Sequence, residues 1–456
     1  MAVAVLAAFA LVAWRFARDG YLPQPFHYDV AGSLMDLYNT AYWANRAGAY
    51  EVWHAIYPPL SFVFLRLASI HACYGADGVA GRHCDWLARW VLVAFFAVNG
   101  PLVFEAYRRV DPRTALPRAV ATSLGLPMLY GLDRGNLLIP CFTFFVLGQG
   151  GLLRSRPLRW LSLAVSLNFK PYLLMIIVPY FVRRQWRWLA GLGVAGLAVY
   201  LVSFALEGSG TPGQIFEDIR LYLSGLSGTH WANIYYATSF WPLAHLMTSG
   251  ASFSAAMSPG AVSAWGAALR LAMRAAQAGC LVCLIAGCLN PSRVNVNRFG
   301  ALAAAFLLTT VTAGSSGYAQ IFLFFLVFLE PWRGFTRITI LICVYLLCIP
   351  ADLALWPVIQ PPAHSWLGAR DVIPDFGVSL GQLLRPAVLL IVQFGLIALN
   401  LQDSLGARGG LPATGARLCG DLPIGSTPSV RQAETAAQGA LPPPLGACVA
   451  AERSCL

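Results

Sequence analysis

Long apolar stretches separated by short polar connections recur along almost the whole chain. Many of them approach the roughly 20 residues that an α-helix needs to cross a bilayer, and the pattern predicts about 10–12 such helices. We expect apolar helices at residues 1–14, 86–105, 119–132, 135–153, 160–182, 189–206, 262–289, 299–314, 317–332, 336–357 and 384–401. The chain is therefore predicted to be an all-α, polytopic membrane protein.

The composition agrees with this pattern. Of the 456 residues, 58% are hydrophobic and only 11% are charged, and the mean hydropathy is +0.62. A soluble domain has about 25% charged residues. The net charge of +11 comes from arginines in short loops, which orient membrane helices, so we expect no nucleic-acid partner. Lys170 is the only lysine in the chain.

The basic residues predict the topology. They cluster at 108–118, 154–159, 183–187, 293–298 and 333–337. The positive-inside rule assigns these clusters to the cytoplasmic side, so residues 160–182 have cytoplasmic signals at both ends. Two half-helices that meet at Asn168–Pro171 satisfy the rule, whereas one crossing does not. Because irregular backbone at membrane depth is tolerated where it lines a cavity, we expect Lys170 at the tip of a re-entrant hairpin.

Two long segments are predicted to lie outside, each with an interfacial helix: residues 19–85 and 207–261. They belong to a membrane domain that spans residues 1–401. Residues 402–456 are rich in Gly, Ala and Pro without periodicity, which predicts a disordered cytoplasmic tail.

The cysteines do not form a disulfide framework in this pattern. Cys73 and Cys84 share one outside segment, where a disulfide is an expectation. Cys280, Cys283 and Cys288 lie in an apolar helix without His or acidic neighbours, so we expect core packing rather than metal binding.

The first candidate for chemistry is Asp36, in the outside stretch MDLYNTAYWA. Helical spacing there predicts that Tyr38 and Tyr42 provide an aromatic surface for a sugar near a general base. The competing interpretation is a solvated acid that caps a helix. Asp29 is the alternative base.

Three further stretches carry polar groups. In MLYGLDRGNLLIP, Asp133, Arg134 and Asn136 surround a turn, either as substrate contacts or as an internal Asp133–Arg134 ion pair. Lys170 is interpreted as an anion-binding cation, against the alternative that it extends to the membrane surface. In TAGSSGYAQ, residues 312–320, Tyr318 and Gln320 are candidate hydrogen-bonding partners of a ligand, or they satisfy the turn.

No Walker loop, Rossmann fingerprint or metal-ligand spacing occurs in the chain. We therefore expect neither a metal cofactor nor a soluble nucleotide donor.

The order of these motifs resembles the bacterial membrane glycosyltransferases of family 87, in the GT-C superfamily. The resemblance is carried by DLYNTAYWA, then YPPL with Tyr57, then the Gly-Asn turn, then FKPYLLMIIVPYFVRRQWRW, and it covers residues 20–330. It implies a GT-C-type fold in the bacterial plasma membrane with the active site facing outside. It also implies a polyprenyl-phosphate-linked sugar donor, usually mannose, a lipid or glycan acceptor, and Asp36 as the catalytic residue.

Together these observations predict a glycosyltransferase that moves a single sugar with inversion. Asp36 would deprotonate the acceptor hydroxyl, and Lys170 would bind the lipid phosphate and stabilise its departure. The predicted substrate contacts are Tyr38, Tyr42, Tyr57, Asp133, Arg134, Asn136, Tyr318 and Gln320. Two alternatives stay open: a transporter or flippase for lipid-linked glycans, since broken helices with a midplane cation also occur in anion transporters, and a polysaccharide polymerase or ligase.

Overall fold

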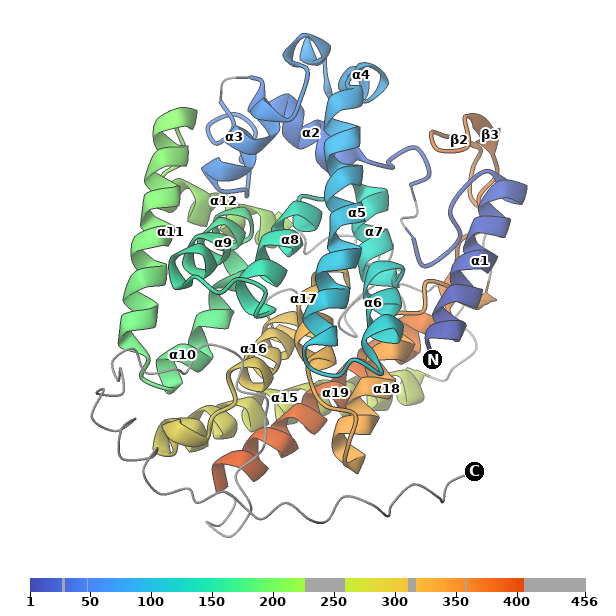
Figure 1. Ribbon diagram of the computed structural model, residues 1–456. Helices are drawn as coiled ribbons and strands as arrows, with labels where there is room; N and C mark the ends of the chain where they lie inside the picture. The colour runs from blue at the N-terminus through green and yellow to red at the C-terminus, as the bar shows by residue number, and fades with distance from the viewer. Residues whose placement is uncertain (27–28, 47, 226–258, 311–316, 357–358, 406–456) are drawn as a thin grey trace, which may run out of the picture. The chain divides into compact units, whose positions relative to one another are not determined.

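The computed structural model describes residues 1–26, 29–46, 48–225, 259–310, 317–356 and 359–405 (Figure 1). The described part is mostly helical. Four of its helices are long and apolar enough to cross a membrane: α5 (Trp86–Arg108), α11 (Trp186–Glu207), the part Ala267–Leu289 of α15 (Pro259–Leu289), and α19 (Leu380–Leu405). The coarse prediction of a helical membrane protein is confirmed.

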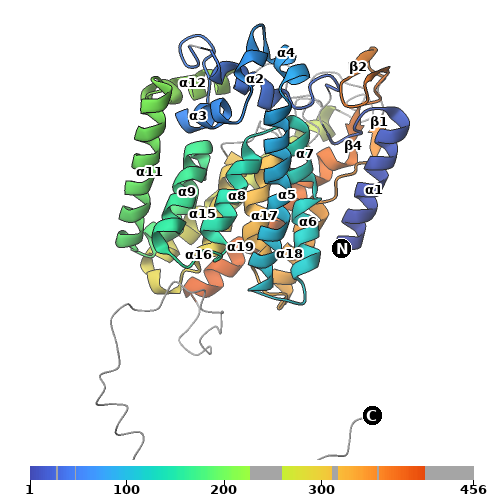
Figure 2. The same cartoon turned by 45° about the horizontal axis from the view of Figure 1, so that its top comes forward.

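Shorter apolar helices pack between these four. They are α6 (Ala115–Ser123), α7 (Leu126–Arg134), α8 (Leu138–Gln149), α9 (Arg156–Phe169), α10 (Val178–Val182), α16 (Val296–Thr310), α17 (Gln320–Phe328) and α18 (Phe335–Leu347). In one half α8 packs against α5 and α9, and α9 packs against α11; in the other α19 packs against α15 and α18 (Figure 2). Helix α1 (Ala2–Asp19) forms as well but is not among the four, so its role as a membrane span stays a prediction.

Residues 19–85, which we call the first outside segment after its predicted location, fold over one end of these helices (Figure 1). It contains α2 (Met35–Ala44), α3 (Pro59–Leu67), a short 3₁₀ turn η1 (His71–Tyr74) and α4 (Gly78–Cys84). The expected disulfide between Cys73 and Cys84 is confirmed, with the Cα atoms 5.5 Å apart. Beside it the buried Asp85 caps α5 by accepting a hydrogen bond from the backbone of Ala88, and its carboxylate also accepts from the Tyr74 hydroxyl. The Tyr38 hydroxyl of α2 donates to the Asp85 carbonyl, which attaches α2 to this part of the segment.

The predicted break at Lys170 is confirmed. Helix α9 ends there in an extended conformation, and a 3₁₀ helix, η2 (Pro171–Ile177), leads into α10. The physical reason is Pro171, whose ring disfavours the helical conformation for the residue before it.

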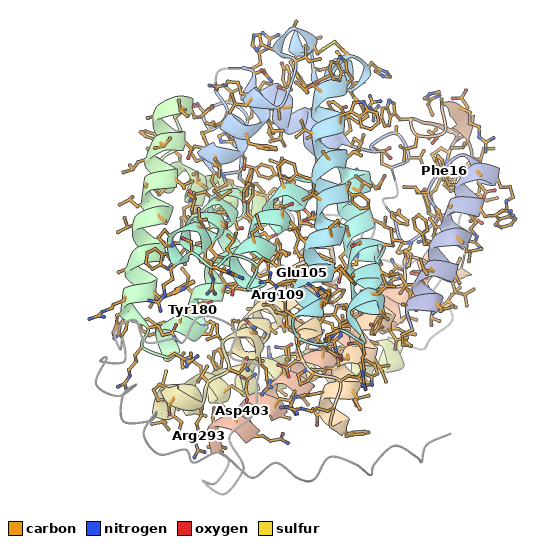
Figure 3. The ribbon with its side chains drawn as sticks, in the orientation of Figure 1. Phe16, Glu105, Arg109, Tyr180, Arg293 and Asp403 are labelled. Atoms are coloured by element: carbon orange, nitrogen blue, oxygen red, sulfur yellow. A yellow bond between two sulfur atoms is a disulfide. The ribbon has the colours of Figure 1, made fainter. Side chains whose placement is uncertain are left out.

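The two outer ends of this broken segment return to the same place, as a hairpin requires. Arg159, at the start of α9, donates to the Gly148 carbonyl, and the Tyr180 hydroxyl on α10 donates to the Gln149 side chain. Both acceptors lie at the end of α8. The end of α5 is there too, because Arg109 donates to the Gly151 carbonyl (Figure 3).

Two predicted spans are wrong in detail. Residues 119–132 form two helices, α6 and α7, because the chain breaks around Gly125 and Pro127 takes an N-terminal position of α7. The span expected at 336–357 ends at Leu347, close to Pro350. Proline disfavours a helical residue before it, which accounts for the early end.

The chain after α18 forms strands that the all-α prediction missed. Strands β1 (Ala354–Trp356) and β4 (Val378–Ser379) pair antiparallel, as do β2 (Ala363–Ser365) and β3 (Arg370–Val372). This segment lies against the first outside segment: the Gln24 side chain exchanges two hydrogen bonds with the Gly377 backbone. Arg82 and Arg89 both stack near the Trp366 ring, at 4.8 and 5.1 Å from its centroid.

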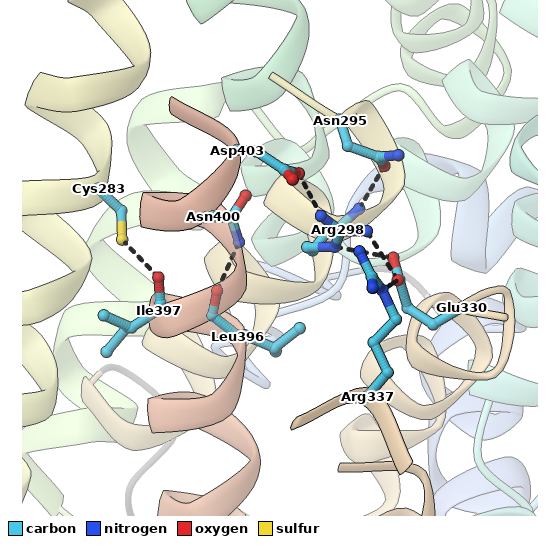
Figure 4. A network of polar contacts seen from close by, with 9 residues as sticks. All are labelled: Cys283, Asn295, Arg298, Glu330, Arg337, Leu396, Ile397, Asn400 and Asp403. Atoms are coloured by element: carbon cyan, nitrogen blue, oxygen red, sulfur yellow. Dashed lines mark hydrogen bonds and ion pairs between the residues drawn. The ribbon is translucent and has the colours of Figure 1, made fainter. Parts of the chain in front are cut away.

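A network of ion pairs around the buried Arg298 and Glu330 joins α16, α18, α19 and the end of α17 (Figure 4). Arg298 pairs with Glu330, at 2.8 Å, and with Asp403, while Arg337 pairs with the same Glu330 at 3.1 Å. We call these four residues the Arg298 network. Each charged side chain in it has a partner of opposite charge.

Two sequence predictions lie largely outside the described residues. The second outside segment, 207–261, is described only through α12 (Pro212–Gly225) and from Pro259 onwards. Helix α19 extends to Leu405, so a tail would begin a few residues later than predicted, and the remaining residues of 402–456 are not described.

Candidate functional site

Asp36 lies in the first turn of α2, and both of its carboxylate oxygens have partners. Arg134 donates to Oδ1 from Nη2 at 2.9 Å, and Asn136 donates to Oδ2 from Nδ2 at 2.9 Å. The Asp36 side chain is nevertheless 26% exposed. These two hydrogen bonds fix the orientation of the carboxylate. Each carboxylate oxygen has a second lone pair, which remains available to accept a proton.

The turn between α7 and α8 brings these two partners to α2. Gly135, between Arg134 and Asn136, has a φ of 68°, a conformation that glycine adopts most easily. A Cβ on it would lie 2.8 Å from the Cβ of Leu37 and 3.0 Å from the Cα of Leu34. The absence of a side chain at Gly135 therefore allows the turn to touch α2 beside Asp36.

The ion pair at this turn is not the internal one that we considered as an alternative. Arg134 pairs with Asp36 and also donates to the Gly32 carbonyl at 2.8 Å. Asp133 instead accepts a hydrogen bond from the Ser33 hydroxyl at 2.8 Å. Residues about 100 positions apart in the chain thus form the site, which spacing within one motif could not reveal.

Lys170 is buried, with 7% of its surface exposed. Its ammonium lies 4.4 Å from the centroid of the Tyr57 ring, a cation–π contact. Within the described part of the chain it has no hydrogen bond or ion pair from that ammonium. The alternative in which Lys170 extends to the membrane surface does not fit a side chain that is this buried.

Tyr57 connects the cation to the carboxylate. Its hydroxyl hydrogen-bonds with the side chain of Asn136, which also bonds Asp36. Burial, and secondarily the charge of Asp36, raise the pKa of Tyr57 well above its usual value, so its hydroxyl stays protonated. The Asp36 charge also acts on Lys170. We call Asp36, Arg134, Asn136, Tyr57 and Lys170 the Asp36–Lys170 cluster.

Two small pockets of different character are lined in part by residues that neighbour cluster members in the chain. One is polar and is lined by Tyr21, Asp29, Ser33, Asp133 and Ser365, among others. The other is apolar and lies between α2, α3, α5 and α8; its lining includes Leu37, Phe64, Leu92, Phe95, Leu137 and Pro140. The lining residues Leu37 and Leu137 directly follow Asp36 and Asn136 in the chain.

The predicted aromatic surface beside Asp36 is only partly present. Tyr38 is fully buried, and its hydroxyl donates to the Asp85 carbonyl, so its prediction as a sugar contact is wrong. Residues two positions apart point to different sides of a helix, which is the physical reason. Tyr42 is half-buried against Trp53, with the ring centroids 5.5 Å apart, and its role stays a prediction.

The last predicted motif lies close to the cluster where it is described. Tyr318 stacks on Tyr130, with centroids 6.1 Å apart, and it interacts electrostatically with Tyr57. Gln320 begins α17 and is fully buried. Ser315 and Ser316 of the same motif lie outside the described residues.

Sequence reasoning missed two contributions. One is the strand-containing segment after α18, whose Ser365 lines the polar pocket. The other is Tyr172, which follows Lys170 by two residues and whose hydroxyl is buried. Its position two residues after the only lysine was the feature of the sequence that could have identified it.

No group of three or more His, Cys, Asp or Glu side chains that could hold a metal occurs in the described ranges. Comparison with known proteins adds no relative, since no family model matches the chain and no curated protein or solved structure matches it either.

Proposed function

We propose that this chain is a membrane glycosyltransferase that transfers a single sugar from a polyprenyl-phosphate donor to a lipid or glycan acceptor. The observation that carries the proposal is Lys170, a buried cation without an ion-pair partner in the described chain, which is linked through Tyr57 and Asn136 to the oriented carboxylate of Asp36. A buried charge is costly unless it is paired, so such a cation indicates an anionic ligand. A phosphate group would supply the charge.

The chemistry assigns one step to each group. Asp36 accepts the proton of an acceptor hydroxyl, whose oxygen attacks the anomeric carbon from the side opposite the phosphate. The bond between that carbon and the phosphate oxygen breaks, and its electron pair stays on the phosphate. Lys170 stabilises the charge that develops there. The configuration at the anomeric carbon is inverted, and no second acid is required because phosphate leaves as an anion.

The two pockets support a lipid-linked donor and a sugar-like acceptor. The apolar side chains that meet between α2, α3, α5 and α8, among them Leu37 and Leu137, are of the kind that contacts an isoprenoid chain. The polar pocket offers Asp29, Asp133 and serine hydroxyls, which accept hydrogen bonds from a polyhydroxylated acceptor.

The disulfide supports the proposed orientation. Cys73 and Cys84 belong to the same outside segment as Asp36, and disulfides persist in oxidising compartments. We therefore place the site on the outer face of a bacterial plasma membrane.

The test is a transfer assay with the full-length protein in lipid nanodiscs. The protein is incubated with radiolabelled polyprenyl-phosphomannose and a lipid extract, and in parallel with a nucleotide-linked mannose. We expect a labelled product only from the lipid-linked donor. Uptake of the lipid-linked donor across proteoliposomes without any product would contradict the proposal and favour a transporter.

A further inference from the structure

Tyr172 lies in η2, two residues after Lys170, and its hydroxyl is buried. This hydroxyl has no hydrogen-bond partner within the described part of the chain. Its ring packs near Phe322, with centroids 6.3 Å apart. The side chain is thus held in place by apolar contacts while its polar atom is unsatisfied.

Other buried tyrosine hydroxyls in the described chain are satisfied. Tyr180, in the same hairpin, donates to Gln149 at 3.1 Å, and Tyr74 donates to Asp85 at 2.7 Å. A buried hydroxyl without a partner destabilises the fold, and most such groups in native proteins have one. Tyr172 is one of several side chains in the described chain with a buried polar atom that lacks a partner, and in its case a ligand would explain the missing bond.

The surroundings of Tyr172 identify the side on which such a ligand would lie. Tyr172 interacts electrostatically with Tyr57 and Tyr318. The Lys170 ammonium lies over the Tyr57 ring, and it also has no ion-pair partner in the described residues. Lys170 contacts Tyr57 directly and Tyr172 lies within electrostatic range of it, so one cation and one hydroxyl donor without partners in the described residues match a ligand rich in acceptor oxygens.

We propose that the Tyr172 hydroxyl donates a hydrogen bond to a non-bridging oxygen of the lipid phosphate that Lys170 neutralises. This inference rests on the proposed function, and it adds a binding residue to the donor site. Removing the hydroxyl should weaken phosphate binding, and because the hydroxyl is unsatisfied without ligand, its removal should not destabilise the free protein.

Tyr172→Phe tests this, with Tyr180→Phe as a matched control in the same hairpin. The full chain in nanodiscs is titrated with undecaprenyl phosphate, and with undecaprenol as a ligand that lacks the phosphate. Thermal unfolding is measured for each variant without ligand. We expect Tyr172→Phe to weaken undecaprenyl phosphate binding about tenfold, the loss of one hydrogen bond to a charged group, with an unchanged or higher Tm.

The control should behave in the opposite way. Tyr180→Phe removes a satisfied hydrogen bond, so its Tm should fall while its affinity for undecaprenyl phosphate stays unchanged. If Tyr172→Phe retains wild-type affinity, the inference is wrong and the proposed function is unaffected. If the wild-type protein binds undecaprenol as tightly as undecaprenyl phosphate, the phosphate site itself fails, and the proposed function fails with it.

Discussion

Two of the regions in which the protein buries charged side chains differ in how the charges are paired. In the Arg298 network every charged group has an ion-pair partner (Figure 4). In the Asp36–Lys170 cluster Arg134 pairs with Asp36, but Lys170 contacts only an aromatic ring among the described residues. A closed set of ion pairs joins helices to one another, whereas the unpaired Lys170 is the feature from which we infer an anionic ligand.

The largest expected difference between the two regions is in the rate of sugar transfer. Asp36→Asn keeps the size of the side chain and an acceptor for Arg134 but removes the base. We expect transfer to fall by about 2–4 orders of magnitude, the usual contribution of a positioned base, while undecaprenyl phosphate binding is retained. The measurement is the initial rate of the transfer assay.

Asp29→Asn and Asp133→Asn are the controls for this variant, since both residues line the neighbouring polar pocket. Each should keep a measurable rate. If Asp29→Asn abolishes transfer and Asp36→Asn does not, the base is Asp29 and our assignment of Asp36 is wrong.

The Arg298 network should respond in stability rather than in activity. Glu330→Gln leaves Arg337 without its partner and Arg298 with only Asp403. Breaking a buried ion pair costs roughly 3–5 kcal/mol, and we expect the lower half of this range because Arg337 is 25% exposed. Thermal unfolding in detergent should show a lower Tm, and the rate per folded molecule should be unchanged. A normal Tm with lost activity would reverse the roles that we assign to the two regions.

A smaller effect tests the turn that supports Asp36. Gly135→Ala introduces a side chain at a positive φ and against Leu37, and the conformational strain alone costs about 1–2 kcal/mol. We expect a lower Tm and a reduced transfer rate, because Asn136 and Arg134 move relative to Asp36. Gly193→Ala, in open space on α11, is the matched control and should be neutral. Equal effects of the two variants would show that the turn is not specifically required.

The sequence predicted the features that depend on local chemistry. Apolar length identified the long helices, Pro171 marked the break, and the only lysine marked the cation. The sequence could not predict contacts between residues far apart in the chain, such as that of Arg134 on α7 with Asp36 on α2. The apolar run at 119–132 did not reveal that Gly125 and Pro127 divide it into two helices. The strands after α18 are two or three residues long, too short for an alternating pattern to be recognised in the sequence.

The central claim is that Lys170 binds a phosphate, and the affinity of Lys170→Met for undecaprenyl phosphate tests it most directly. Binding to the full chain in nanodiscs should weaken about 10- to 100-fold, because a charge-assisted contact is lost, and the ligand-free protein should be at least as stable as wild type. Lys170→Arg should restore binding only in part, since a planar guanidinium differs in shape from an ammonium. Unchanged affinity in Lys170→Met, together with a lower Tm, would show that Lys170 is a structural residue and would contradict this account.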